Sequence, residues 1–139
     1  VSRVDAAVSV VPPGKSMVIS GDIPPWEGEE DFNAGVWVAK NTAQGRALMD
    51  RWMAHYPADK WKKSDDDHSW TCSGAWAGVD YEQGSFRAHL MTDEQVHKLD
   101  WRELQSPYPE EHPNSIAFHF AAHHKEQALP AYLHSNPKT

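Results

Sequence analysis

The sequence predicts an α/β fold, a sheet flanked by helices, on three observations. Residues 17–20 form an apolar run between a Pro-Pro-Gly turn and Gly-Asp, as expected of a buried strand. Residues 35–40 are β-branched, aromatic and small without polar alternation, which indicates a second buried strand. After this second strand, apolar residues recur at the spacing of one helix face over residues 48–56. Strands alternating with helices favour a layered domain that binds ligands near the carboxyl ends of its strands.

The helix after residue 40 has the clearest pattern in the chain. Asn41 or Thr42 can cap it, and Pro57 ends it. Its apolar side chains recur at helical spacing, so we expect one face to pack on the sheet. These apolar residues are Leu48, Met49, Trp52, Met53 and Tyr56.

The middle of the chain has weaker signals. Residues 57–79 combine Pro, Lys, Ser, an acidic run and scattered Trp without a period, and so predict a long ordered loop. Residues 80–90 predict a short helix capped by Asp80. Residues 92–95 fit a capping-box turn, and residues 96–101 predict an edge strand.

The last part of the chain returns to regular structure after a rigid connector. Residues 106–113 contain three Pro, which disfavour both a helix and a central strand. Residues 115–120 predict a strand, and residues 124–133 predict a helix interrupted at Pro130.

Composition limits the domain count and the classes of function. The chain has 139 residues, 40% hydrophobic and 24% charged, which predicts one domain spanning residues 1–139. The formal net charge of −7, without a basic cluster, argues against a nucleic-acid-binding surface. The single cysteine, Cys72, excludes an intrachain disulfide. No apolar run approaches the roughly 18 residues of a membrane-spanning segment, so we expect none in this chain.

Two groups of polar residues fall near the predicted strand and helix ends. Asn33 and Gly35 can hydrogen-bond a hydroxylated ligand and let it approach closely, or they can form an ordinary turn where a strand begins. Asp80, Glu82 and Gln83 stand at a helix start. A carboxylate beside an amide can hold sugar hydroxyls or lie next to a developing oxocarbenium centre, whereas capping alone explains Asp80.

A third group contains imidazoles and a lysine. His119, His123 and His124 suit a transition metal and Lys125 suits a phosphate, while plain structural or surface roles are the alternative. The acidic run at residues 65–68 can hold a hard cation, although a solvated loop is the simpler explanation.

Taken in order, these groups resemble a known family. Residues 32–41 are similar to the strand FNxGvxxxxN of metal-dependent, retaining glycosyltransferases of the GT-A fold, which include glycogenin-like, lipopolysaccharide galactosyltransferase-like and galactosyl/xylosyltransferase-like enzymes. Glu82 and Gln83 are similar to the family's acidic-Gln pair, with Glu where Asp is usual. Residues 119–125 resemble its His-x-x-Gly-x-x-Lys segment, with Ala122 in place of Gly.

The resemblance covers roughly residues 17–133 and implies a partial GT-A-like fold. It implies transfer of a sugar from a nucleotide-sugar donor to a hydroxyl group of a glycan or protein acceptor. It also implies a divalent cation, by analogy manganese, held by His119 and Asp5. Glu82 and Gln83 are implied as the catalytic pair. The donor-binding residues that it implies are Asn33, Gly35, Asp80 and Lys125.

Departures from the family pattern leave an alternative open. The family's Asp-x-Asp signature and its nucleotide-binding half have no counterpart here, since residues 3–5 supply one carboxylate. We therefore expect the C-terminal part of a larger glycosyltransferase, or a non-catalytic scaffold or carbohydrate-binding subunit. A His-rich metal-binding module is a third interpretation, but it leaves Asn33 and the Glu82-Gln83 pair unexplained. Family members work in the Golgi lumen or in the cytoplasm, so localisation stays open.

Overall fold

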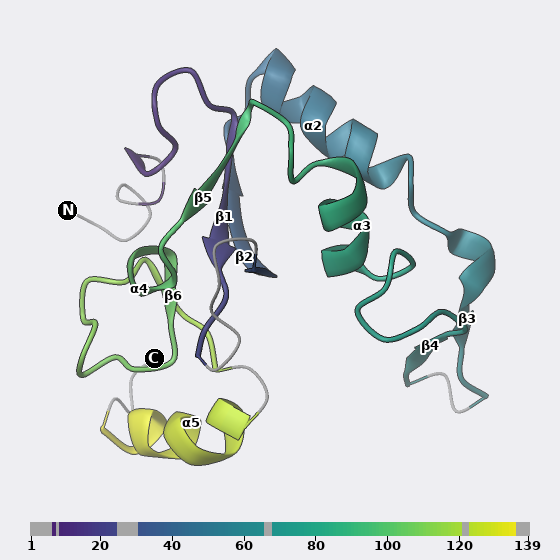
Figure 1. Ribbon diagram of the computed structural model, residues 1–139. Coiled ribbons are helices and arrows are strands. Elements are labelled where there is room, and N and C mark those ends of the chain that lie inside the picture. Colours follow the sequence, from purple (N-terminus) through teal and green to yellow (C-terminus); the bar gives the residue numbers. More distant parts are fainter. Residues whose placement is uncertain (1–6, 8, 25–30, 66–67, 121–122, 136–139) are drawn as a thin grey trace.

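The structure is a computed structural model and combines strands with helices. A three-stranded sheet, two two-stranded sheets and the packed helices make up the part that it describes (Figure 1). The predicted mixed α/β class is therefore confirmed, although the strands form small separate sheets. The structure describes residues 7, 9–24, 31–65, 68–120 and 123–135.

The three-stranded sheet places β1 (Met17–Gly21) between β2 (Phe32–Ala39) and β5 (Val96–Leu99). β1 pairs with β2 in antiparallel and with β5 in parallel orientation. Every residue of β1 is buried, as its apolar run predicts for a strand covered on both faces. β5 is an edge strand, as predicted, but it ends at Leu99, and the predicted strand residue Trp101 begins a helix instead.

β2 differs from the buried strand that the sequence predicts. It is an edge strand, and the side chains of its second half are only partly covered. Gly35 and Trp37 are exposed, so the prediction of a buried strand over residues 35–40 is wrong. An apolar run does not distinguish a doubly covered strand from an edge strand whose aromatic side chains line a surface.

Two helices cover one face of this sheet (Figure 1). α2 (Ala43–Met53) begins after Thr42, whose side chain accepts a backbone hydrogen bond from the first turn, as predicted for its cap. α3 (Glu82–His89) begins after Tyr81, and no side chain in the described part of the chain caps it. The prediction that Asp80 caps this helix is wrong, because Tyr81 occupies the N-cap position and Asp80 lies one residue before it.

The alternation of side chains along β1 divides the core into two layers. Met17 and Ile19 pack with Phe86 on the side of α2 and α3. Val18 points to the opposite side and packs with Leu104. Because successive side chains of a strand point to opposite faces, one short buried strand supplies both layers.

The segment predicted as a long loop contains regular structure. A 3-10 turn at Ala58–Lys60 leads into β3 (Trp61–Lys63), which pairs in antiparallel orientation with β4 (Trp70–Cys72). This hairpin projects from the end of α2, away from the central sheet (Figure 1). The loop prediction over residues 57–79 is wrong for these strands, since three-residue strands are too short to show a period of two.

After β5, the chain packs Leu104 and Ile116 on the face of β1 opposite to α2 and α3. α4 (Trp101–Leu104) leads into β6 (Gln105–Ser106), which pairs in parallel with β7 (Ala117–Phe118). The proline-rich connector between these strands contains neither helix nor strand, as predicted. α5 (His123–Ser135) continues through Pro130, so the predicted interruption is wrong. Among the described helices, none has the length and apolar character that crossing a membrane requires.

Candidate functional site

A bulge in β2 organises several of the predicted site residues. Ile19 of β1 faces Trp37, while the next residue, Ser20, faces Asn33. Residues 34–36 therefore have no partner on β1 and bulge out of the ladder. A bulge of this kind redirects side chains and leaves backbone amides that need other hydrogen-bond partners.

Two predicted site residues supply those partners. Asn33 Oδ1 accepts a hydrogen bond from the Gly35 amide at 2.8 Å, and Gln83 Oε1 accepts one from the Ala34 amide at 3.3 Å. Asn33 Nδ2 also donates to Asp22 Oδ1 at 3.4 Å. Both side-chain amides thus stabilise the bulge, so Asn33 has a structural role inside β2 and not in a turn where the strand begins.

His119 lies beside the bulge, directly after the carboxyl end of β7. Its Nδ1 lies 2.7 Å from Gln105 Oε1. Because an amide oxygen only accepts hydrogen bonds, this contact assigns the proton to Nδ1 and leaves the lone pair on Nε2. Burial lowers the pKa of the His119 imidazole, and the Asp22 carboxylate opposes this shift. The ring is therefore neutral near pH 7.

Gly35 makes room for the His119 ring. A Cβ atom at Gly35 would lie 2.8 Å from Asn33 Oδ1 and 2.9 Å from His119 Nδ1, and closer still to His119 Cε1. Such contacts are too short for a carbon atom, so any side chain here would displace the imidazole or the amide. The close approach that the sequence predicts at Gly35 is, in the structure, the approach of His119.

We call Asp22, Asn33, Gln83, Gln105 and His119 the polar cluster. Asp22 follows the carboxyl end of β1 and His119 follows that of β7, where α/β folds place their ligands. Gln105 Nε2 is buried without a partner among the described residues, at a cost of about 1–3 kcal/mol. Its carbonyl oxygen contacts His119 Nδ1 and so orients the imidazole.

The described residues do not by themselves complete a metal site. Among them, no three His, Cys, Asp or Glu side chains are close enough to hold an ion. His119 offers Nε2, and the nearby Asp22 carboxylate accepts hydrogen bonds from Asn33 and from the Ile23 amide. Asp5, the second predicted ligand, lies outside the described residues.

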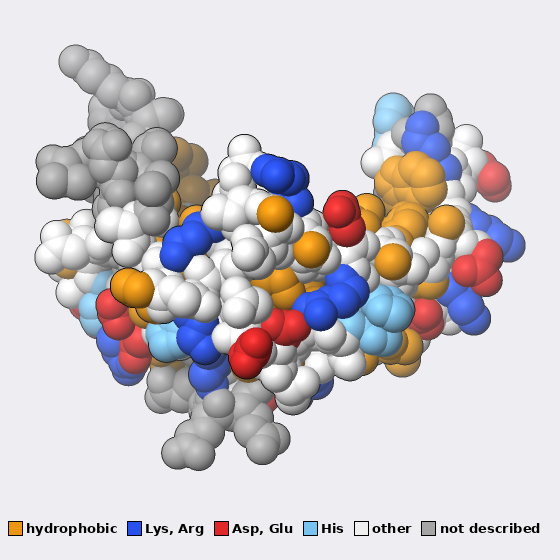
Figure 2. Space-filling model, turned by 90° about the horizontal axis from the view of Figure 1, so that it is seen from above, with side chains coloured by type: hydrophobic (Ala, Val, Ile, Leu, Met, Phe, Trp, Pro, Cys, Tyr) orange, Lys and Arg blue, Asp and Glu red, His pale blue; other side chains and the backbone are white. Residues whose placement is uncertain are grey.

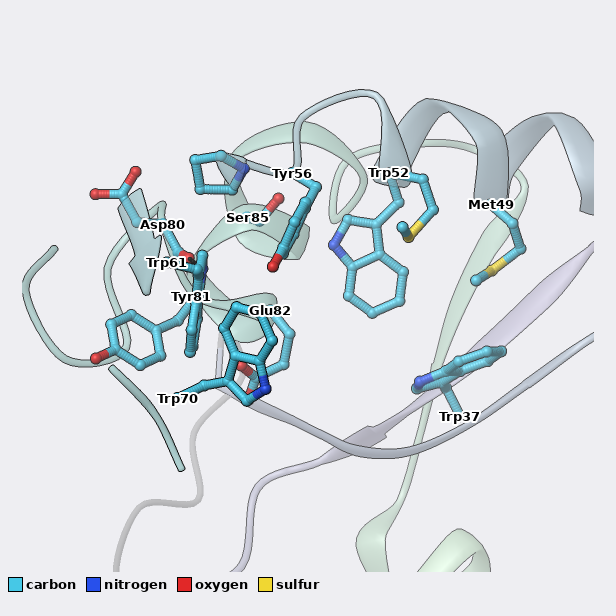
Figure 3. A pocket seen from close by; sticks show the side chains of 12 residues that line it. Trp37, Met49, Trp52, Tyr56, Trp61, Trp70, Asp80, Tyr81, Glu82 and Ser85 are labelled. Carbon is cyan, nitrogen blue, oxygen red and sulfur yellow. Dashed lines mark hydrogen bonds between the residues drawn. The ribbon is translucent and has the colours of Figure 1, made fainter. Parts of the chain in front are cut away.

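A groove lined by aromatic side chains lies beside α2 and α3 (Figure 3). Its volume is about 550 Å³. Asp80 and Glu82 are its acidic residues, and none of the described residues that line it is Lys, Arg or His. In Figure 2, hydrophobic side chains gather beside the hollow between the body of the molecule and the arm that carries the hairpin. The aromatic residues of this aromatic groove are Trp37, Trp52, Tyr56, Trp61, Trp70 and Tyr81.

Three separate elements bring these rings together. Trp37 comes from the bulged strand β2, Trp52 from α2, and Trp70 from the hairpin. Trp37 meets Trp52 nearly edge-on, with ring centroids 5.9 Å apart and planes at 72°. The end of the predicted helix face does not pack on the sheet, since Met53 and Tyr56 are 62% and 52% exposed. α2 ends at Met53, so Tyr56, which the sequence places on its apolar face, lies beyond the helix.

The start of α3 separates two predicted site residues. Glu82 is exposed and lines the aromatic groove, while the next residue, Gln83, bonds to the bulge. Asn33 and Gln83 therefore meet at the bulge, whereas Glu82 lines the groove, so the three residues that the resemblance assigns to donor binding and catalysis do not share one pocket. The aromatic groove and the polar cluster are neighbours, joined by two consecutive residues of one helix.

Asp80 and Tyr81 support the aromatic groove. The Asp80 carbonyl accepts a hydrogen bond from Trp61 Nε1 at 3.0 Å, and the Asp80 side chain lies over Gly74. Burial, and then the charge of Cys72, raise the pKa of the Tyr81 phenol. Tyr81 therefore keeps its hydroxyl proton and can donate a hydrogen bond.

The other predicted residues lie apart from both sites. Lys125 is exposed on α5 and has no contact with the polar cluster among the described residues. His123 and His124 begin α5, but their side chains are not described. Of the acidic run at residues 65–68, the structure describes only the first and the last residue.

Sequence reasoning missed Gln105, Asp22 and Trp70. Asp22 had one available signal, because it follows a predicted strand at the carboxyl end. Gln105 had none, since a single buried glutamine shows no pattern. Trp70 stood in a segment without a period, where a lone aromatic residue carries no directional information.

Comparison with known proteins adds no relative. No family model, no curated protein and no solved structure matches this chain. The function is therefore argued from the geometry of the two sites and from the resemblance in sequence.

Proposed function

We propose that this chain is the C-terminal part of a GT-A-type retaining glycosyltransferase. It would transfer a sugar from a nucleotide-sugar donor to a hydroxyl group of a glycan or protein acceptor. The observation that supports this best is the polar cluster. Asn33, Gly35, Gln83 and His119 carry the resemblance in sequence, and they come from distant parts of the chain to one bulge.

His119 has the properties of a ligand to a divalent cation. Its ring is neutral near pH 7, its Nδ1 is held by Gln105, and its Nε2 has no hydrogen-bond partner among the described residues. The resemblance adds Asp5 as a second ligand. A bound cation, by the resemblance manganese, would neutralise the diphosphate leaving group.

The remaining roles follow from the groups that the bulge leaves available. The side-chain oxygens of Asn33 and Gln83 hold the bulge, so their NH2 groups are what they can offer to donor hydroxyls. The Glu82 carboxylate, exposed at the start of α3, is the acidic member of the proposed catalytic pair. The resemblance also assigns donor contacts to Asp80, which lines the aromatic groove, and to Lys125, which is exposed on α5.

A non-catalytic, carbohydrate-binding scaffold is the second candidate. Two observations favour it: the described residues do not complete a metal site, and Asn33 has a structural role in the bulge. Such a subunit would keep the fold and the aromatic groove and would lack turnover.

Sugar transfer or hydrolysis by the full-length natural protein tests the first candidate. We expect turnover of a nucleotide-sugar with manganese and loss of turnover with a chelator. We expect His119→Asn to lower turnover by roughly 100-fold, because ligand or positioning changes typically have effects of this size. His134→Asn, which changes an exposed residue of α5, is the matched control.

The outcomes separate the two candidates. Metal-dependent turnover that His119→Asn lowers by the expected amount and His134→Asn preserves supports the enzyme. Binding of carbohydrate without turnover of any nucleotide-sugar selects the scaffold. A protein that neither binds nor turns over any member of a nucleotide-sugar panel rules out the enzyme.

A further inference from the structure

The aromatic groove exposes more apolar surface than the fold needs. Trp70 is 59% exposed and Trp37 is 39% exposed, although both side chains are large enough to form a core. Contiguous apolar surface of this kind on a soluble domain marks a place where another molecule binds. The volume of about 550 Å³ lies in the range of pockets for small organic ligands.

Contacts with neighbouring side chains hold two of the Trp rings of the aromatic groove, Trp37 and Trp61, in place. Trp37 is held nearly edge-on by Trp52, and Trp61 by Tyr81, with centroids 5.2 Å apart and planes at 64°. The hydrogen bond from Trp61 Nε1 to the Asp80 carbonyl also restricts rotation of the Trp61 side chain. Rigid rings present flat faces at low entropic cost, and those faces carry negative electrostatic potential.

The charge of the aromatic groove selects among ligands that stack on aromatic rings. Nucleic-acid bases stack well, but their phosphates need basic side chains, and the described lining contains none. Sugar rings carry no charge, and their weakly positive C–H groups match aromatic faces. Their hydroxyl groups match the acceptor oxygens of Glu82 and the hydroxyl of Tyr81.

The lining also distinguishes a sugar from a protein segment. Grooves that hold an apolar helix use aliphatic side chains to fill irregular gaps, whereas most of the described apolar lining here is aromatic and its flexible aliphatic residues are Met49 and Met53. Flat aromatic faces with a carboxylate at one end fit flat, hydroxylated rings better than they fit branched side chains.

We propose that the aromatic groove binds a neutral oligosaccharide, which stacks on Trp37 and Trp70 and hydrogen-bonds to Glu82. In the proposed glycosyltransferase this oligosaccharide is the acceptor, and that assignment rests on the proposed function. Glu82 lines the groove and Gln83 bonds to the bulge, so the bound oligosaccharide ends next to the polar cluster.

Titration of the full-length protein with neutral oligosaccharides, without donor or cation, tests the proposal. The probes are linear hexasaccharides of β-1,4-glucose, α-1,4-glucose, β-1,4-mannose and β-1,4-xylose, and tryptophan fluorescence and calorimetry report binding. We expect at least one probe to bind, and Trp70→Ala to weaken its affinity by about fivefold to tenfold. Glu82→Gln should weaken it less, because the amide oxygen still accepts a hydrogen bond.

Leu133→Ala is the matched control. Leu133 is a 48% exposed apolar residue of α5 and does not line the groove, so its loss should leave the affinity unchanged. Equal weakening by Leu133→Ala and Trp70→Ala, or no binding of any probe, would overturn the proposal. Self-association that Trp70→Ala abolishes would overturn it too, because the groove would then be an interface between copies.

These results are independent of the proposed function. Oligosaccharide binding that Trp70→Ala weakens, in a protein without turnover, keeps the groove assignment and refutes the enzyme. Donor hydrolysis that Trp70→Ala leaves intact, in a protein that binds no oligosaccharide, keeps the enzyme and refutes the groove assignment.

Discussion

Aromatic side chains have opposite surroundings in the core and in the aromatic groove. Phe32 and Phe86 are fully buried between the sheet and α3, with ring centroids 5.4 Å apart. Tyr56 and Trp70, which line the groove, are 52% and 59% exposed. Burying a large apolar side chain stabilises a fold, whereas an exposed ring contributes little. The core rings therefore serve stability, whereas the exposed groove rings are available for binding.

The largest expected effect is a loss of stability when a core ring is truncated. Phe86→Ala leaves a cavity beside Phe32 and Trp52, and we expect the free energy of unfolding to fall by about 3–5 kcal/mol. Trp70→Ala removes an exposed ring and should change it by less than about 1 kcal/mol. Urea unfolding followed by circular dichroism measures both. Equal losses for the two variants would contradict the division between core and groove.

The bulge lies between these two regions, and Gly35→Ala tests how tightly it is packed. The added Cβ displaces the His119 ring or the Asn33 amide, and we expect a loss of about 1–3 kcal/mol in stability together with a shifted His119 imidazole resonance. Gly21→Ala is the control, since its Cβ would meet the Leu99 carbonyl at an ordinary 3.4 Å. An unmoved His119 resonance in Gly35→Ala would show that the bulge is not packed as described.

The buried imidazole makes stability depend on pH in the polar cluster. Burial lowers the folded-state pKa of His119 below its ordinary value of 6.5, so the unfolded chain binds the proton more readily. The contribution of His119 is therefore complete above pH 6.5 and is lost as pH falls through the folded-state pKa. We expect His119→Gln to flatten this dependence, measured by unfolding in a chelator between neutral and acidic pH. His134→Gln should leave it unchanged.

The smallest expected effect concerns backbone strain beside the aromatic groove. Ala77 has a φ of +56°, the only positive φ of a non-glycine residue in the described part of the chain. Ala77→Gly relieves the strained conformation, and we expect a gain of about 0.5–1 kcal/mol in unfolding free energy. Ala75→Gly, in the same loop without a positive φ, should give no gain. A loss for Ala77→Gly would show that the loop is not strained.

Local patterns in the sequence were sufficient for several elements. β1 is an apolar run between turn residues, and α2 combines a cap at Thr42 with apolar residues at helical spacing. The positions of α3 and β5 were also close to the prediction. Such signals depend on neighbours within a few positions along the chain, so they can be recognised without any knowledge of long-range contacts.

The sequence also marked Asn33, Gly35, Gln83 and His119 as a group, but it did not show what joins them. Asn33 and Gln83 act through side-chain amides that bond to backbone atoms of β2. Which backbone amides lack a partner depends on the register between β1 and β2, and no local pattern encodes a bulge.

Local signals in the sequence place the buried strand and the amphipathic helix, because apolar periodicity and caps act over a few residues. Long-range packing places the His119 ring against Gly35, brings the Gln105 carbonyl to His119 Nδ1, and gathers exposed rings of three elements into one groove. These arrangements depend on packing between segments far apart in the chain, and such packing follows from the fold as a whole.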